Sequence, residues 1–180
     1  LKRLADKVGP AVVGISASAP RGRSNEGGGR SGDVRRSEPS GAGIVVRPEG
    51  YVLTSGSVVP AGARRITVTL PGGMKLAAEE ASRDDKLGLV ALRLKGVPNG
   101  GVQALYFADD VPAIKRGKLV MTFGNPFGTI TRDGQAAMSV GTLSGIDGTT
   151  LETDAAVNPG SFGGPLVDAG GNVIGIVVPE

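Results

Sequence analysis

The sequence predicts an all-β protein with one short N-terminal helix. Glycine and proline are frequent, with 31 and 12 residues among 180, and only 3% of the residues are aromatic. Short apolar segments alternate with turn signals along most of the chain, which is typical of barrels and sandwiches made of short strands. The length suits one medium domain, residues 1–180, with one or two adjoining cores. The pattern alone leaves barrel and sandwich open.

The N-terminal half, residues 1–95, is expected to begin with a helix and continue in strands. Leu1, Leu4, Ala5 and Val8 recur at helical spacing, and the dipeptide that follows at 9–10 is Gly-Pro, a stop signal. Strands are predicted where apolar or alternating runs lie between turn signals. These runs cover residues 11–15, 43–46, 51–53, 66–70, 74–78 and 87–94.

Residues 20–40 are expected to form a disordered loop within that half. The segment is rich in Gly, Ser and Arg, with almost nothing apolar to bury. Its five arginines against three carboxylates supply +2 of the formal charge of +3. A docking or regulatory loop, including one that contacts anionic lipid or RNA, is the alternative. The rest of the chain shows no basic face with aromatic platforms, so no nucleic-acid partner is expected.

The C-terminal half, residues 102–180, is predicted to be a second set of strands. The turn-rich stretch 96–101 has no periodicity and suits a bridge between the halves. Apolar runs typical of strands follow it. They cover residues 118–123, 136–143, 150–153, 165–167 and 173–178.

Four short motifs occur in order and carry a resemblance to a known family. They are SGAGIVV at 40–46, GYVLT at 50–54, GNPFG at 124–128 and TDAAVNPG at 153–160. In this order the chain resembles the HtrA (Deg) family of trypsin-like serine proteases from about residue 1 to residue 176. The resemblance implies two six-stranded antiparallel β-barrels packed side by side, with the cleft between them. It also implies a base, an orienting acid and a nucleophile at that cleft.

The chain departs from the family at each of these catalytic positions. The resemblance places the general base at Ser57, the orienting Asp at Gly88, and the nucleophile at Phe162 in the run GSFGG. A hydroxyl is no base near neutral pH, and neither glycine nor phenylalanine supplies the other two roles. The sequence contains no His and no Cys, which excludes Ser-His and Cys-His catalysis by its own side chains.

These departures predict a pseudoprotease that binds proteins as a scaffold or regulatory module. Loss of a triad costs on the order of 10⁶ in turnover. The candidate peptide-binding and oxyanion loop runs through six residues, with backbone donors expected at Gly160 and Phe162. The large apolar ring of Phe162 is expected to fold into the cleft and plug it. The six loop residues are Asn158, Pro159, Gly160, Ser161, Phe162 and Gly163.

Two other chemistries remain open as alternatives. An active endopeptidase would need a displaced nucleophile at Ser161 with a base other than His, such as Lys86. The doublets at 84–85 and 109–110, all Asp, would suit only a hard, oxygen-loving ion, and such doublets are usually solvated turns. No metal and no cofactor are expected.

The resemblance also implies partners and a location. It implies a protein or peptide ligand, a homo-trimer or a hetero-oligomer with an active relative, and PDZ domains that follow this chain in a longer protein. It implies an extracytoplasmic place, periplasmic or in the cell envelope, with any membrane anchor outside these residues. The tight turn at 145–149 replaces a longer sensing loop of the family, so allosteric activation is not expected. Residues 178–180 stop short of the last strand that the resemblance implies.

Overall fold

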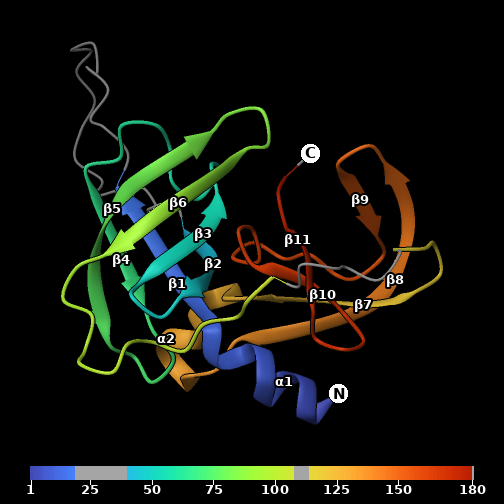
Figure 1. Cartoon of the computed structure of the whole chain (residues 1–180), viewed down its shortest axis with the longest axis horizontal. Coiled ribbons are helices and arrows are strands. Elements are labelled where there is room, and N and C mark those ends of the chain that lie inside the picture. Colours follow the sequence, from blue (N-terminus) through green and yellow to red (C-terminus); the bar gives the residue numbers. More distant parts are fainter. Residues whose placement is uncertain (19–39, 108–113, 180) are drawn as a thin grey trace, which may run out of the picture.

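The computed structural model describes residues 1–18, 40–107 and 114–179 (Figure 1). Most of the predicted loop at 20–40 and the carboxylate doublet at 109–110 lie outside these residues. Within the described parts the chain is almost entirely β, as the composition predicts. The strands form two separate sheets that lie side by side.

The N-terminal half is a closed six-stranded barrel, which confirms the prediction for this half. The strand order around it is β1-β2-β3-β6-β5-β4, and β4 pairs back onto β1. Its interior is filled by aliphatic side chains from every strand, among them Ile15, Val52 and Leu92. The strands are β1 (Val12–Ser18), β2 (Ser40–Arg47), β3 (Tyr51–Ser55), β4 (Arg65–Thr69), β5 (Lys75–Asp84) and β6 (Leu89–Leu94).

The C-terminal half forms a second antiparallel sheet, with five described strands where the resemblance implies six. Its described residues form an open five-stranded sheet in the order β11-β10-β7-β8-β9. That order repeats the order β5-β4-β1-β2-β3 of the first barrel, and a counterpart of β6 is not among the described residues, so β9 and β11 remain unjoined. The strands are β7 (Leu119–Gly124), β8 (Ala137–Asp147), β9 (Thr150–Thr153), β10 (Pro165–Asp168) and β11 (Val173–Ile176).

The predicted N-terminal helix is confirmed as α1 (Lys2–Val8), followed by the 3₁₀ turn η1 (Gly9–Ala11). It buries Val8 and donates a hydrogen bond of 2.9 Å from Lys7 Nζ to the carbonyl of Gly170, next to β10. No helix of the described residues is long and apolar enough to cross a membrane.

A second short helix was not predicted. The 3₁₀ turn η2 (Pro126–Gly128) leads into α2 (Thr129–Asp133), which begins and ends at glycines with positive φ, Gly128 at 69° and Gly134 at 71°. Five residues are too few to show a helical period, so only the two glycines signal it.

A shared core fixes the two halves against each other. Val12, Ala42 and Ile44 of the first barrel pack in one cluster with Met121 and Phe123 of β7, and Val8 of α1 joins them. These side chains are fully or almost fully buried. The two halves are therefore held by a common apolar layer rather than as two independent units.

Candidate functional site

The three positions where the resemblance places catalytic groups lie close together between the two halves. The amide of Gly56 donates to the carbonyl of Gly88 over 2.7 Å, which brings the segment before Ser57 against position 88. Phe162 comes from the other half, and its carbonyl accepts a hydrogen bond of 2.8 Å from the amide of Ala42 in β2. The positions share one site, but their side chains are a hydroxyl, a hydrogen and a benzyl group.

Ser57 lies on the segment that follows β3. Its hydroxyl is 2.9 Å from that of the buried Ser55, and its amide donates to the same Ser55 oxygen over 3.2 Å. The segment is closed as a tight turn by the amides of Val58 and Val59, which both donate to the carbonyl of Ser55. Ser57 is exposed at the tip of this hydrogen-bonded turn, where it offers a hydroxyl and no base.

Gly88 ends the turn between β5 and β6. Its φ of +65° is left-handed, and a Cβ built on it would meet nothing within 4 Å. The space where an orienting carboxylate would emerge is therefore open. This left-handed conformation disfavours most side chains, although aspartate tolerates it better than most.

Phe162 is partly buried and packs against the apolar core of the first barrel. Its carbonyl and the side chain of Val58 both lie within about 3 Å of where a Cβ on Gly41 would sit, which places the two residues next to each other. The side chain therefore bridges the halves at the place where the nucleophile would stand. This arrangement agrees with the burial expected for the ring.

The candidate loop, residues 158–163, consists of two successive turns. The amide of Ser161 donates to the carbonyl of Asn158 over 2.9 Å, and that of Gly164 to the carbonyl of Ser161 over 3.0 Å. Asn158 and Pro159 are exposed, whereas Gly160 is buried. Among the described residues, the amides of Gly160 and Phe162 donate no backbone hydrogen bond. Within that part of the chain, both expected oxyanion donors are thus unengaged.

Close backbone packing explains the glycines of this loop. Gly160 has a φ of +95°, and its carbonyl accepts from the amide of Asn125 over 2.9 Å. A Cβ on Gly163 would collide with the carbonyl oxygen of Ala42, and one on Gly164 with that of Phe123. Gly163 also donates to the carbonyl of Val177 over 2.7 Å. The loop is held by both halves and by the segment after β11.

Ser161, the nucleophile of the alternative hypothesis, is buried with 5% of its surface exposed. Its Oγ lies 2.8 Å from the place where a Cβ on Gly124 would sit, so the hydroxyl faces β7. Lys86 is exposed in the turn after β5, on the other half. This placement favours a packing role for Ser161 over that of a nucleophile.

The carboxylate doublet at 84–85 lies in the same turn. Asp84 Oδ1 accepts hydrogen bonds from the amides of Lys86 and Leu87 at 2.9 and 3.0 Å, as an Asp at a turn does. Among the described residues, no three Asp or Glu side chains gather closely enough to hold a metal ion.

Asp154, within the TDAAVNPG motif, fixes the start of the candidate loop to β8. Its carboxylate accepts hydrogen bonds from both the amide and the hydroxyl of Thr142. The amide bond first, and the hydroxyl bond second, lower the pKa of Asp154 below its ordinary value, against a smaller opposing effect of burial. The residue acts as a brace and stays away from Ser57 and Gly88.

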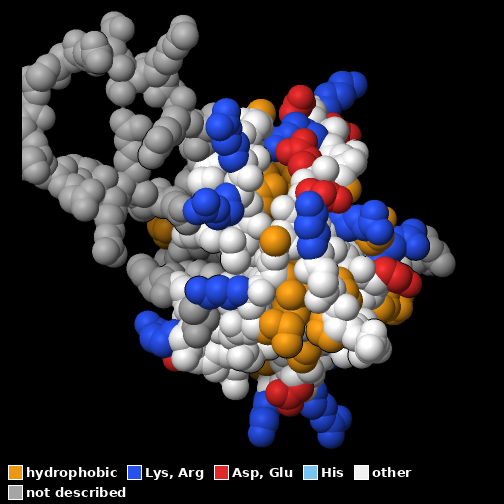
Figure 2. Space-filling model, turned by 90° about the vertical axis from the view of Figure 1, so that its left-hand side faces the viewer, with side chains coloured by type: hydrophobic (Ala, Val, Ile, Leu, Met, Phe, Trp, Pro, Cys, Tyr) orange, Lys and Arg blue, Asp and Glu red, His pale blue; other side chains and the backbone are white. Residues whose placement is uncertain are grey.

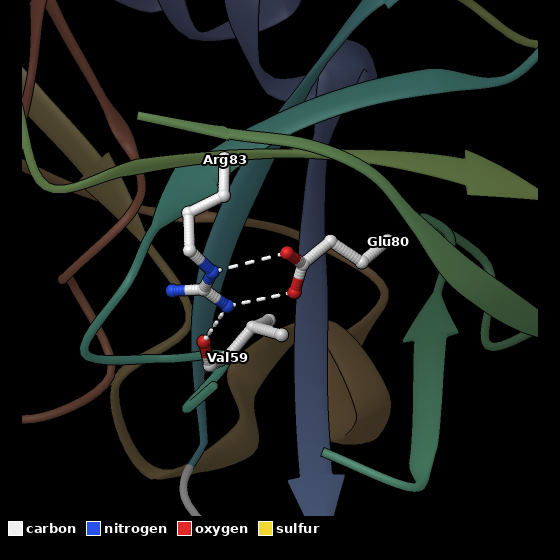
Figure 3. Close-up of polar contacts among 3 residues, drawn as sticks. All are labelled: Val59, Glu80 and Arg83. Carbon is white, nitrogen blue, oxygen red and sulfur yellow. Dashed lines mark hydrogen bonds and ion pairs between the residues drawn. The ribbon is translucent and has the colours of Figure 1, made fainter. Parts of the chain in front are cut away.

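Sequence reasoning missed one group beside the site, Arg83 of β5 (Figure 3). Its guanidinium pairs with Glu80 and donates a hydrogen bond of 2.8 Å to the carbonyl of Val59, two residues after Ser57. The Glu80 hydrogen bond raises the already high pKa of Arg83. No sequence signal marks the contact, because Val59 is 24 residues away along the chain.

One face of the molecule, turned by 90° from the view of Figure 1, shows how its charges are distributed (Figure 2). Lysine and arginine side chains are scattered over this face among uncharged surface, and acidic side chains lie between several of them. Apolar side chains gather in a small area lower on the same face. The described part of this face therefore shows no continuous basic stripe of the kind that a nucleic-acid binder would present.

Comparison with known proteins gives one consistent result. The family model for the trypsin-like peptidase domain matches residues 41–176. The chain is 35% identical over 155 residues to a probable periplasmic serine protease do/HhoA-like of Haemophilus influenzae, covering 83% of this chain and 32% of that protein. It is 28% identical over 191 residues to the serine protease Do-like HtrA of Bacillus subtilis, covering 96% and 41%. The chain thus spans well under half the length of these curated relatives.

Proposed function

This chain belongs to the trypsin-like peptidase domain family, as a domain of the HtrA/Deg type, and from that premise we propose that it is a pseudoprotease. In this proposal the domain keeps the protease framework and binds protein or peptide ligands without cutting them. It serves as a scaffold, a substrate-holding module or a regulator of an active relative.

The observation that carries the proposal is the set of side chains at the site. Peptide hydrolysis by this fold needs a group that takes a proton from the nucleophile and returns it to the leaving amine. The chain has no imidazole and no thiol, and the gathered positions hold Ser57, Gly88 and Phe162. The oxyanion donors and binding alone leave roughly 10³ to 10⁴ over the rate in water, which is negligible for peptide bonds.

What remains at the site suits binding. Phe162 packs on the first-barrel core, and exposed apolar side chains precede and follow it in the chain, at Val157 and Val178 with 41% and 42% of their surfaces exposed. Unpaired backbone beside such side chains can add an extended peptide as a further strand. A segment of an unfolded protein is therefore the proposed ligand, held by backbone pairing and apolar contact.

The wider setting is proposed from the relatives. The Haemophilus influenzae relative is named a probable periplasmic protease, so we place this domain outside the cytoplasm, in the periplasm or cell envelope. Assembly as a homo-trimer, or with an active relative, and PDZ domains elsewhere in the full protein belong to the same proposal.

The test is a paired assay of cleavage and binding. The purified chain is incubated with fluorescently labelled casein, with an active HtrA-type protease assayed in parallel, and binding of the same casein is measured by anisotropy. We expect saturable binding and no turnover above the buffer rate. Turnover that survives repurification and disappears in Ser161→Ala would instead establish the alternative endopeptidase. Absence of both binding and turnover would remove the scaffold proposal.

A further inference from the structure

We propose that Arg83 is a positioning residue that holds the segment carrying Ser57, residues 55–60, in place as the first-barrel wall of the cleft. The inference concerns the shape of this wall and does not depend on the proposed loss of catalysis. It goes beyond the peptide-binding proposal because it assigns the wall's geometry to a group that lies outside the family motifs.

A β-bulge brings Glu80 and Arg83 to the same side of β5. Residues three apart in a regular strand point to opposite faces. The register of β5 on β6 shifts between Glu80 and Ser82, so Ala81 is the additional residue and Arg83 pairs with Val90. The bulge adds one residue to the count, and Glu80 and Arg83 then face the same way. Their side chains meet beside Val59 of the segment 55–60 (Figure 3).

The guanidinium makes three hydrogen bonds there. Arg83 Nε donates to Glu80 Oε1 over 3.0 Å, and one terminal nitrogen donates to Glu80 Oε2 over 2.7 Å and to the carbonyl of Val59 over 2.8 Å. The Arg83 side chain is only 17% exposed. A bidentate pair fixes the plane of the guanidinium, so its remaining donors are aimed rather than freely rotating. The contact that this fixed plane directs is the hydrogen bond to the carbonyl of Val59 in the segment 55–60.

Gly56 provides the room that Arg83 occupies. A Cβ on Gly56 would lie 3.2 Å from the other terminal nitrogen of Arg83 and 3.5 Å from the carbonyl oxygen of Gly88. The guanidinium therefore lies against the loop on both sides of Ser57, at Gly56 and at Val59. Two contacts that flank one residue restrain its position more than either alone.

A second ion pair, between Glu79 of β5 and the residue that follows β6, supplies a matched control. Glu79 and Lys95 are 2.7 Å apart, with side chains 50% and 59% exposed. This pair has the same charges and lies on the same barrel, but among the described residues it makes no hydrogen bond to the loop 55–60. Exposed pairs of this kind contribute little to stability. Removing the Glu79–Lys95 pair therefore measures the effect of losing an ion pair that does not contact the segment 55–60.

The absence of native cysteine allows a direct measurement at the loop. Ser57→Cys introduces a unique thiol, whose rate of modification by a neutral maleimide or line shape with a nitroxide label reports the mobility of the segment. We expect Arg83→Met to increase the modification rate several-fold and sharpen the nitroxide spectrum, with Arg83→Lys intermediate. Lys95→Met should leave both readings unchanged. A thiol at the exposed Ser144 of β8 should respond to none of these variants.

A double-mutant cycle tests the steric part separately. In the native background, the methyl group added by Gly56→Ala presses against the guanidinium of Arg83. In the Arg83→Met background, the same methyl group contacts a flexible thioether. We therefore expect Gly56→Ala to lower the urea midpoint clearly in the native background and much less in the Arg83→Met background. Additive effects would contradict direct contact.

Two results would overturn the role of Arg83. If the label at 57 behaves alike with Arg83, Arg83→Met and Lys95→Met, the guanidinium does not position the loop. If the labelled variants fail to fold, amide exchange of Val58 and Val59 measured by NMR in the unlabelled protein replaces the thiol. Unchanged exchange at these two amides in Arg83→Met, relative to amides of β1, would reject the assignment.

Discussion

Phe162 has a structural role at the position where the resemblance places the nucleophile. A nucleophilic serine at this place would contribute little apolar surface, whereas the benzyl group packs on the core of the first barrel beside Val58. Compared with a serine, a phenylalanine at this position thus adds burial across the junction of the two halves.

Phe162→Ala is expected to destabilise the chain by about 1–2 kcal/mol, below the range for a fully buried Phe because the ring is only partly covered. Urea unfolding followed by circular dichroism measures this change. Phe162→Leu serves as the control and should retain most of the stability. Equal midpoints for native and Phe162→Ala proteins would mean that the ring does not bridge the halves. Neither variant should acquire peptidase activity.

Gly164 tests the packing of the loop backbone. A Cβ there would overlap the carbonyl oxygen of Phe123, which is backbone in the buried strand β7 and cannot rotate away. Gly164→Ala should therefore unfold the chain or lower its free energy of unfolding by several kcal/mol, in line with severe overpacking, as urea unfolding would measure. The control is Gly9→Ala, because a Cβ on Gly9 meets nothing within 4 Å and its φ is −51°. A soluble, native-like Gly164→Ala protein would show that the loop can shift.

The motif order gave candidate positions for the site, but it carried no information on the contacts that hold them. Ser57, Gly88 and Phe162 were expected from the resemblance, and the structure gathers them between the halves. Arg83 escaped notice because its role depends on a bulge at Ala81, and bulges arise from pairing between strands. A single sequence carries no local signal for such pairing.

At the level of elements, the hairpin of β8 and β9 depends on a carboxylate. Asp154 accepts two hydrogen bonds from Thr142, and its pKa is lowered from the ordinary value of 3.8. A carboxyl whose pKa is lower in the folded than in the unfolded chain stabilises the fold above the unfolded pKa. That contribution disappears as the pH falls through the folded pKa.

The amide proton shift of Thr142, followed by NMR from about pH 6 downward, is expected to change with a midpoint below 3.8. Asp154→Asn should abolish this transition and loosen the loop that follows. Asp147→Asn, at the far end of β8, is the control and should leave the Thr142 titration in place. A Thr142 amide that does not respond to acid would refute the brace.

The strands were predictable because each carries its own apolar alternation, and the errors fall where that signal ends. Every predicted strand is present, while β5 continues to Asp84, well beyond its predicted end at Ala78. Residues after Ala78 are mostly polar, so their composition does not predict a strand. Backbone pairing with β6 nevertheless extends β5 through them. The sixth strand expected for the second barrel is not among the described residues, and its absence there could not be predicted from any property of β9 or β11, because closure depends on a partner strand.

For the whole molecule, the two halves should differ in local stability. The first barrel is closed and encloses a cluster of thirteen buried apolar residues. The cluster inside the second sheet has three. Local opening requires less free energy where fewer buried apolar contacts and backbone hydrogen bonds must break. We therefore expect the second half to open more readily than the first, despite their shared core.

Hydrogen exchange read by mass spectrometry is expected to show slow exchange in β1, β3 and β6, and fast exchange along the unpaired sides of β9 and β11. Amides of β7, which lie at the centre of the second sheet and in the shared core, should be intermediate or slow. Uniform protection from β1 through β11 would contradict this account. The comparison is internal to one sample, so no second protein is needed.

The crowded turns at Gly160, Gly163 and Gly164 have an evolutionary consequence. Any side chain at Gly163 or Gly164 collides with backbone carbonyls of neighbouring strands, so selection for folding alone is enough to preserve these two glycines. A lineage that abandons catalysis can lose the catalytic side chains at positions 57, 88 and 162 and still keep the glycines at 163 and 164. The glycines that mark the family are therefore retained because of packing. Their presence in a chain indicates a shared backbone shape and is no evidence of enzymatic activity.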